Sequence, residues 1–152
     1  MAKVIVSDTS CLIVLSKIDE LDLLRKLYKT VTITQEILLE YGENLPDWVS
    51  VQQVKDNFRQ QLLEMQIDKG EASAIALAME THDSVVILDD WKARKLAEKL
   101  GINVTGTLGM IIKAKNTGVI SSIKPYLNKI KETNFRISED IEQVALKEAK
   151  EK

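Results

Sequence analysis

The side chains best suited to chemistry in this sequence are carboxylates that follow short apolar runs. Asp8 comes shortly after the run at residues 4–6, and Asp89 and Asp90 directly follow the run at residues 85–88. Continuous apolar runs of this kind are typical of strands buried in a parallel sheet. Parallel strands end at the same edge of an open sheet, where ligands bind. We therefore expect these three carboxylates to share one edge.

Other acids fall at helical positions from which they could reach the same edge. Glu71 lies in the first turn of a helix predicted from the spacing of apolar residues after it, and Glu36 and Glu40 lie four residues apart on another helix. Clustered carboxylates with no nearby histidine or thiolate set suit hard divalent cations, because Mg²⁺ and Mn²⁺ prefer oxygen ligands. The pattern indicates a site for Mg²⁺ or Mn²⁺.

Each acid also has an ordinary structural explanation. An acid after a strand could cap the next helix, and Glu71 could complement the dipole of its own helix. Glu36 and Glu40 could belong to a solvated helix face. The pair Asp89 and Asp90 favours chemistry, because a cap needs one acid and close carboxylates repel each other without a cation.

Other reactive residue types are sparse. The single histidine, His82, has no acid placed to orient it, and the single cysteine, Cys11, is best explained as a small buried apolar residue. The turn at residues 105–109 is similar to a phosphate-binding turn but lacks the lysine and the spacing of a P-loop. Within it, Thr107 could place a hydroxyl beside the acids or cap the following helix.

Basic residues follow two of these segments. Lys92, Arg94 and Lys95 come after the aspartate pair, and Lys113 comes after the turn. Charge runs are usually solvated faces, but beside an acidic metal centre they would suit a polyanionic substrate. Since the net charge is −2, nucleic acid would have to be bound through local basic patches or metal ions.

The elements that must position these residues alternate along the chain. The chain has 152 residues, 45% of them hydrophobic, which fits one domain. Strand-like runs alternate with helical patterns, which predicts an α/β protein with a helix-covered parallel sheet. The expected strands lie at residues 4–6, 31–33, 49–51, 85–88 and 102–105; the expected late helices lie at 108–114, 120–130 and 139–150. No membrane span or signal peptide is recognisable, so we expect a cytoplasmic protein.

Several of these segments occur in an order that resembles a known family. The order is Asp8-Thr9-Ser10, the helix start Gly70-Glu71-Ala72, the pair Asp89-Asp90, and Thr105-Gly106-Thr107-Leu108-Gly109. It is similar to that of the PIN-domain family, in particular a branch of predicted nucleic-acid-binding proteins related to VapC-type toxins. The resemblance implies a three-layer α/β/α sandwich with a mostly parallel sheet. It implies a PIN-like nuclease domain at residues 1–135 and a C-terminal helical extension at 136–152.

The resemblance also implies roles for individual residues. The implied catalytic acids are Asp8, Glu40 (with Glu36 as the alternative), Glu71 and Asp90. The implied metal ligands are Asp8, Glu71, Asp89 and Asp90, with Ser10 supporting Asp8. Two features depart from the family pattern: the third acid is glutamate rather than aspartate, and the helix of Glu36 and Glu40 lacks an initial proline.

The function implied is that of a metal-dependent endoribonuclease, the toxin of a toxin–antitoxin pair, with a cognate antitoxin as partner and a homodimer as the assembly. We expect RNA to be bound as a single strand near Lys92, Arg94, Lys95 and Lys113. One alternative is a catalytically inactive module that binds RNA or an antitoxin. Another is a phosphoryl-transfer domain, which Ser10 disfavours because such enzymes commonly carry a second aspartate there.

Overall fold

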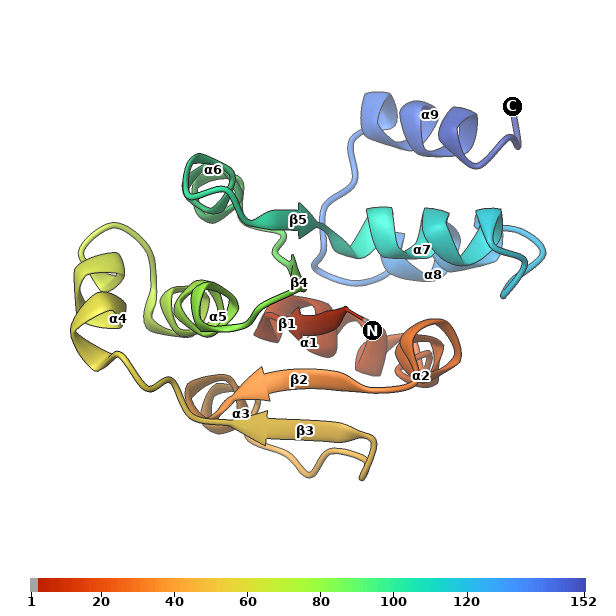
Figure 1. Cartoon of the computed structure of the whole chain (residues 1–152). Helices are drawn as coiled ribbons and strands as arrows, with labels where there is room; N and C mark the ends of the chain where they lie inside the picture. The colour runs from red at the N-terminus through yellow and green to blue at the C-terminus, as the bar shows by residue number, and fades with distance from the viewer. Residues whose placement is uncertain (1–2) are drawn as a thin grey trace.

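The five apolar runs form a single parallel sheet (Figure 1). The structure is a computed structural model that describes residues 3–152. The strands are β1 (Val4–Ser7), β2 (Val31–Thr34), β3 (Val49–Gln52), β4 (Ser84–Ile87) and β5 (Asn103–Thr105). Their order across the sheet is β3-β2-β1-β4-β5. The predicted α/β class and the parallel sheet are therefore confirmed.

The order of the strands determines where a site can form. The chain runs outward from β1 to β3 and then crosses back to β4, which pairs with β1 on its other side. Ligands of such sheets bind where the direction of winding reverses, which here lies between β1 and β4. Ser7 pairs with Ile87 in the register of these strands, so Asp8 and Asp89 leave the sheet at nearly the same level.

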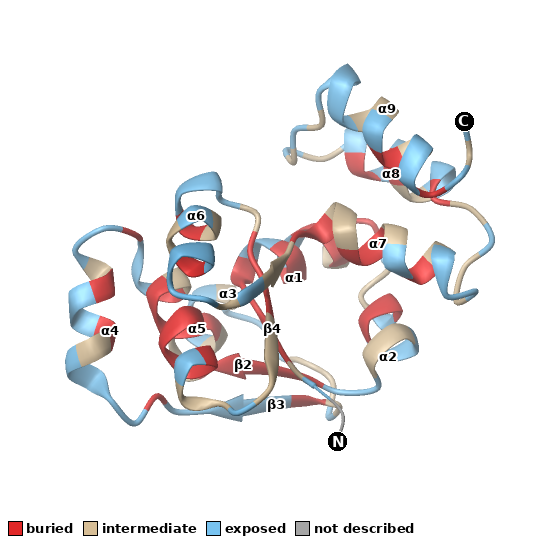
Figure 2. Ribbon diagram, turned by 45° about the horizontal axis from the view of Figure 1, so that its top comes forward, coloured by how far each residue is buried: buried red, intermediate tan, exposed pale blue. Residues whose placement is uncertain are grey.

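Helices cover the sheet on two sides (Figures 1 and 2). In the described chain they are α1 (Thr9–Lys17), α2 (Asp22–Tyr28), α3 (Gln35–Tyr41), α4 (Asn57–Glu64), α5 (Lys69–Glu80), α6 (Trp91–Lys99), α7 (Thr107–Asn116), α8 (Lys124–Lys131) and α9 (Glu139–Glu148). Figure 1 shows α4, α5 and α6 to the left of the strands and α7, α8 and α9 to the right. Helices α2, α3, α5 and α6 contact strands directly, and α9 packs on α7. The predicted three-layer α/β/α sandwich is confirmed. No helix within residues 3–152 is long and apolar enough to cross a bilayer.

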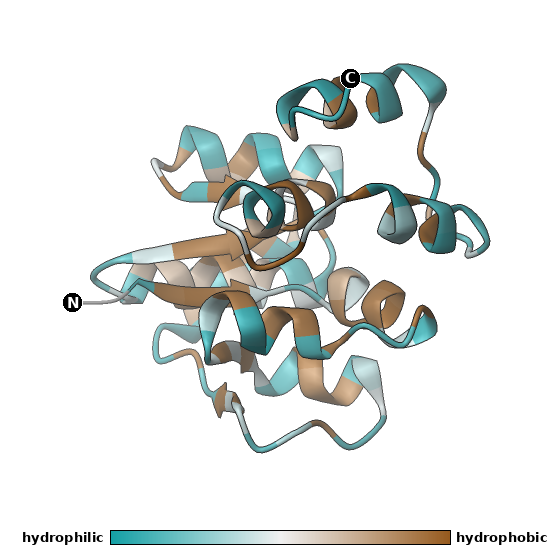
Figure 3. Ribbon diagram, turned by 90° about the vertical axis from the view of Figure 1, so that its right-hand side faces the viewer, coloured by the Kyte–Doolittle hydropathy of each residue, from teal (hydrophilic) through white to brown (hydrophobic). Residues whose placement is uncertain are grey.

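Helix α5 packs most deeply, because its sequence is rich in small residues. Its segment from Ala72 to Ala78 is buried throughout (Figure 2), and it contacts β1, β2 and β4 as well as α3, α4 and α6. Small side chains allow the helix axis to approach the sheet closely. The apolar strands and the more polar outer turns of the surface helices separate clearly in Figure 3.

The C-terminal helix is attached to the rest of the molecule by apolar and polar contacts. Ala145 and Ala149 are buried, and Lys115 on α7 donates a hydrogen bond to the carbonyl of Ala149 (2.7 Å). The carboxylate of Glu151 accepts hydrogen bonds from the hydroxyl of Ser122 (2.6 Å) and the backbone N–H of Ile123 (2.7 Å). The boundary between a domain at 1–135 and an extension at 136–152 stays a prediction.

Replacing Glu151 by alanine tests whether this attachment stabilises the fold. The change leaves the N–H of Ile123 and the hydroxyl of Ser122 without their acceptor. We expect a loss of about 2 kcal/mol in the free energy of unfolding, or about 4–8 °C in Tm. Thermal unfolding measures it, with the exposed Glu43→Ala as control; equal Tm values for the two variants would contradict the attachment.

Candidate active site

Asp8 is a buried carboxylate that joins two turns at the carboxyl edge of the sheet. Its side chain is only 2% exposed. Its Oδ1 accepts a hydrogen bond from the N–H of Cys11 (2.9 Å), which caps α1, and its Oδ2 accepts one from the N–H of Asp89 (3.1 Å). Burial, and then the charge of Asp89, raises the pKa of Asp8 well above its usual value.

Asp89 makes the corresponding connection to the next turn along the sheet. Its two oxygens accept hydrogen bonds from the N–H (2.8 Å) and the hydroxyl (2.6 Å) of Thr107, at the start of α7. Burial raises the pKa of Asp89, while Thr107 and the charge of Arg94 act in the opposite direction. Arg94 approaches Gly106 closely beside Asp89: a Cβ at position 106 would lie 2.5 Å from Nη1 of Arg94 and 3.1 Å from Oδ1 of Asp89, so a larger residue would displace the guanidinium.

Glu71 approaches the same edge from the first turn of α5. The carboxylate of Asp68 caps this helix by accepting the N–H of Glu71 (2.9 Å). Burial raises the pKa of Glu71 to about 7, and the charges of Asp68 and Asp90 act in the same direction. Glu71 therefore lies in a region where carboxylates repel one another and solvent screening is incomplete.

The structure distinguishes the positions of Glu40 and Glu36 on α3. Oε1 of Glu40 accepts a hydrogen bond from the hydroxyl of Thr9 (2.5 Å), and a Cβ on Gly70 would lie 2.6 Å from the same oxygen. Glu36 instead accepts a hydrogen bond from the amide of Gln60 on α4 (2.7 Å). Glu40 is thus directed toward Asp8 and Glu71, whereas Glu36 is directed toward α4.

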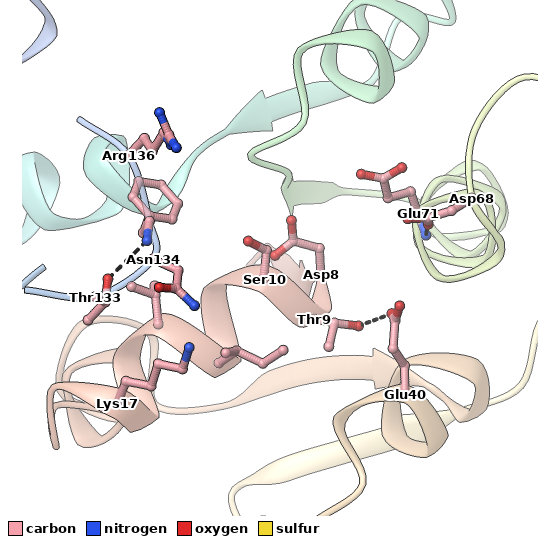
Figure 4. A pocket seen from close by; sticks show the side chains of 13 residues that line it. Asp8, Thr9, Ser10, Lys17, Glu40, Asp68, Glu71, Thr133, Asn134 and Arg136 are labelled. Atoms are coloured by element: carbon pink, nitrogen blue, oxygen red, sulfur yellow. Dashed lines mark hydrogen bonds between the residues drawn. The ribbon is translucent and has the colours of Figure 1, made fainter. Parts of the chain in front are cut away.

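These acids line a cavity of about 460 Å³, which we call the acidic cavity (Figure 4). Its acidic lining residues are Asp8, Glu40, Asp68 and Glu71. Its other wall consists of Lys17 on α1 and residues 133–136 between α8 and α9. Figure 4 shows Asp68 and Glu71 on one side of Asp8, and Arg136 and Lys17 on the other. The cavity is therefore acidic at one end and basic at the other.

Two other predicted site residues, Asp90 and Ser10, differ in their position relative to the acidic cavity. Asp90 is exposed, and its Oδ2 caps α6 by accepting the N–H of Ala93 (3.0 Å). Asp90 does not line the acidic cavity, although its charge raises the pKa of Glu71. Ser10 does line the cavity and lies beside Asp8 (Figure 4).

Three of the four predicted nucleic-acid-binding residues make contacts within the protein. The ammonium of Lys95 lies 5.5 Å from the ring centre of Trp91, and that of Lys113 lies 5.5 Å from the ring centre of Tyr28. Arg94 donates a hydrogen bond to the carbonyl of Leu88 (3.2 Å). Lys92 is exposed on α6. The cations that line the acidic cavity are Lys17 and Arg136, which no pattern in the sequence marks as site residues.

The donor set suits a hard divalent cation, although its side chains are not gathered into a closed metal site. Within residues 3–152, no group of three or more histidine, cysteine, aspartate or glutamate side chains is arranged to hold a metal ion. The acids nevertheless offer only oxygen donors, as Mg²⁺ and Mn²⁺ require. Burial and neighbouring acids raise the pKa values of Asp8 and Glu71, so a cation in the cavity would relieve an existing repulsion.

The fold and the site define a class of protein: an open parallel α/β sheet with carboxylates gathered where its winding reverses. A family model described as a PIN domain (DUF3368) matches residues 4–151. The chain therefore belongs to the PIN-domain family, whose members are generally nucleases. No curated protein and no solved structure matches the chain significantly.

Replacing Glu71 by glutamine tests whether burial and neighbouring acids destabilise the charged carboxylate. Because the pKa of Glu71 is raised to about 7, the wild-type protein loses stability as the pH rises through that value, and the variant does not. In excess chelator at pH 8.5 we expect the variant to have the higher Tm, by about 2–4 °C after allowance for solvent exposure. The difference should vanish below pH 4.5, where the carboxyl is neutral in both states.

Thermal unfolding across this pH range measures the effect. Glu139→Gln, an exposed change on α9, serves as the control. A Glu71→Gln protein that is no more stable than wild type at pH 8.5 would show that neither burial nor the neighbouring acids destabilise the charged form of Glu71.

Proposed function

We propose that the chain is a metal-dependent endoribonuclease that hydrolyses RNA phosphodiester bonds. The observation that carries the proposal is the meeting of Asp8, Glu40 and Glu71 in one cavity of a PIN fold. Three different elements deliver these acids: the β1–α1 turn, α3 and α5. A merely solvated set of acids would have no reason to converge on a cavity from separate parts of the chain.

The residues would divide the work of hydrolysis. Asp8 and Glu71 would hold Mg²⁺ or Mn²⁺, with Asp89 and Asp90 completing the acidic surroundings. A bound divalent cation supplies an activated water and offsets the charge of the phosphate. Asp8 is fixed by its two backbone N–H donors, and Ser10 lies beside it. Glu40, oriented by the hydroxyl of Thr9, would accept the proton of the attacking water.

We further propose that this nuclease is the toxin of a toxin–antitoxin pair, acts in the cytoplasm and forms a homodimer. Exposed apolar side chains support an interface of this kind. On α4, Phe58 and Leu62 are 68% and 49% exposed, and Met65 at the C-cap of this helix is 82% exposed. Leu39 on the neighbouring α3 is 71% exposed. Contiguous exposed apolar residues commonly mark protein interaction surfaces.

A second candidate function is a catalytically inactive module that binds RNA or an antitoxin. It is favoured by the caps that Asp8 and Asp90 provide for α1 and α6, since these hydrogen bonds alone give both acids a structural role. The two functions differ in whether the cavity binds a metal ion, which can be measured without knowledge of the substrate.

Replacing Asp8 by asparagine tests the nuclease function. Wild-type protein should cleave a mixed RNA pool with Mn²⁺ and should gain thermal stability from the same ion. The variant should lose at least about 100-fold in cleavage rate and most of the stabilisation, because a neutral amide is a poor ligand for the cation. The control is Asp83→Asn, because Asp83 precedes β4 and lies at the opposite edge of the sheet.

Two results would contradict the nuclease function. One is cleavage that continues unchanged in excess chelator. The other is an intact, folded wild-type protein that neither cleaves RNA nor is stabilised by Mn²⁺, which would favour the inactive module.

The double substitution Phe58→Ser and Met65→Ser tests the proposed dimer. Removing two exposed apolar side chains from α4 and its C-cap should shift the protein toward monomer, because the change affects the interface and not the buried core. Light scattering after gel filtration measures the mass. Val144→Ser, an equally polar change to an exposed residue of α9, should leave the dimer intact; a dimer in both variants would place the interface elsewhere.

A further inference from the structure

A second cavity adjoins the acidic one and is not explained by metal binding. It has a volume of about 520 Å³ and lies between α6, the β5–α7 turn and α9. Much of its lining is apolar, including Trp91, Leu108, Ile141 and Val144. Its polar lining includes Asp89 and Arg94 at the carboxyl edge of the sheet. We call it the tryptophan cavity.

Trp91 is the most unusual residue of this cavity. It is the first residue of α6, directly after the pair of aspartates, and it is 70% exposed. Most of the apolar indole ring is therefore open to solvent and free to be covered by a ligand. The ammonium of Lys95 lies 5.5 Å from the ring centre, which adds positive charge beside the aromatic surface. An aromatic ring next to a cation suits an unpaired nucleobase and its phosphate.

Arg136 connects the two cavities. It lines both of them, as does Phe135 beside it. Among residues 3–152, neither Arg136 nor Lys17 takes part in an ion pair. A cation without an acidic partner, placed across a cavity from Asp8 and Glu71, is complementary to a phosphate that approaches those acids.

We propose that the tryptophan cavity is a base-binding subsite, with Trp91 as its stacking platform and Arg136 as the phosphate-binding residue at the junction. The substrate is then a single strand of RNA that passes from the tryptophan cavity to the acidic cavity. A duplex does not fit this role, because its bases are stacked on one another and present no free face to the indole. This inference rests on the proposed nuclease function only in that the RNA strand is taken to continue from the tryptophan cavity into the acidic cavity. RNA binding itself can be measured without cleavage.

Binding of fluorescently labelled RNA to the full chain, in excess chelator, tests the stacking platform. The probes are a single strand of about ten nucleotides, its duplex, and an abasic strand with the same number of phosphates. The Trp91→Ala protein should bind the single strand about 5- to 100-fold more weakly than wild type, and Trp91→Phe should retain most of the affinity. The abasic strand should bind wild type and Trp91→Ala equally, because it has no base to stack.

Replacing the other tryptophan, Trp48, provides a matched control and leaves Trp91 as the fluorescent reporter. Trp48 precedes β3 and therefore lies at the opposite edge of the sheet. The Trp48→Phe protein should bind RNA as wild type does, and the fluorescence of its remaining Trp91 should be quenched when the single strand binds. Circular dichroism establishes that each variant is folded.

The role of Arg136 is tested by salt dependence. Arg136→Ala should weaken the binding of both the normal and the abasic strand and should lower the slope of log affinity against log salt by about one. Arg136→Lys should restore the slope. Arg25→Ala is the matched control, because Arg25 pairs with Asp22 on α2 and lies outside both cavities.

Equal binding of the single strand by wild type and Trp91→Ala would overturn the subsite, as would duplex binding as tight as that of the single strand. Equal binding by wild type and Trp91→Ala is also the result expected if the tryptophan cavity binds a protein partner instead of RNA. Trp91-dependent binding without cleavage under any metal would refute the nuclease function and leave the subsite standing. Metal-dependent RNA cleavage together with unchanged RNA binding by Trp91→Ala would refute the subsite and leave the nuclease function standing.

Discussion

The burial of Asp8 at the end of β1 is the interaction on which the rest of the site depends. Its two oxygens accept N–H groups from α1 and from the turn after β4, so one carboxylate fixes two segments that are far apart in sequence. Burial makes this arrangement electrostatically unfavourable, which is why the pKa of Asp8 is raised. The structural and chemical explanations of Asp8 are therefore not exclusive. The same hydrogen bonds that cap a helix also hold an acid in a position where a cation would stabilise it.

Close packing around two glycines gives the neighbouring side chains their positions. Gly70 leaves room for Glu40 to reach the start of α5, and Gly106 leaves room for Arg94 to lie against the last turn of the sheet. In both places a charged group occupies the volume that a Cβ would need. The arrangement of the acids thus depends on residues that carry no chemistry themselves. It also depends on the small side chains that let α5 approach the sheet.

The sheet was predictable from the sequence because strand burial and strand order follow from simple patterns. All five runs are strands, and the acids after β1 and β4 meet because parallel strands end at one edge. Helix α4 was not anticipated, since half of its residues are exposed and its apolar side chains do not mark a core face. Residues 120–123 were expected to be helical but precede α8, which begins at Lys124. Local propensity could not decide this boundary.

The walls of the cavities were harder to predict than the acids. The spacing of Asp68 and Glu71 resembles a helix cap and could have identified Asp68. No local pattern, however, brings residues 133–136 over α1, because loops have no periodicity and their positions depend on the packing of the helices around them. The basic residues expected to bind RNA were chosen by proximity in sequence. Two of them, Lys95 and Lys113, lie over aromatic rings.

The segment 133–136 has a mechanical consequence for the molecule. It runs between α8 and α9, and the far end of α9 is held to the start of α8 by the carboxylate of Glu151. The segment is therefore one side of a closed loop of packed structure rather than a free flap. Any force that lifts the last helix is transmitted to the wall of the cavity. The end of α9 and the wall of the acidic cavity are therefore mechanically coupled.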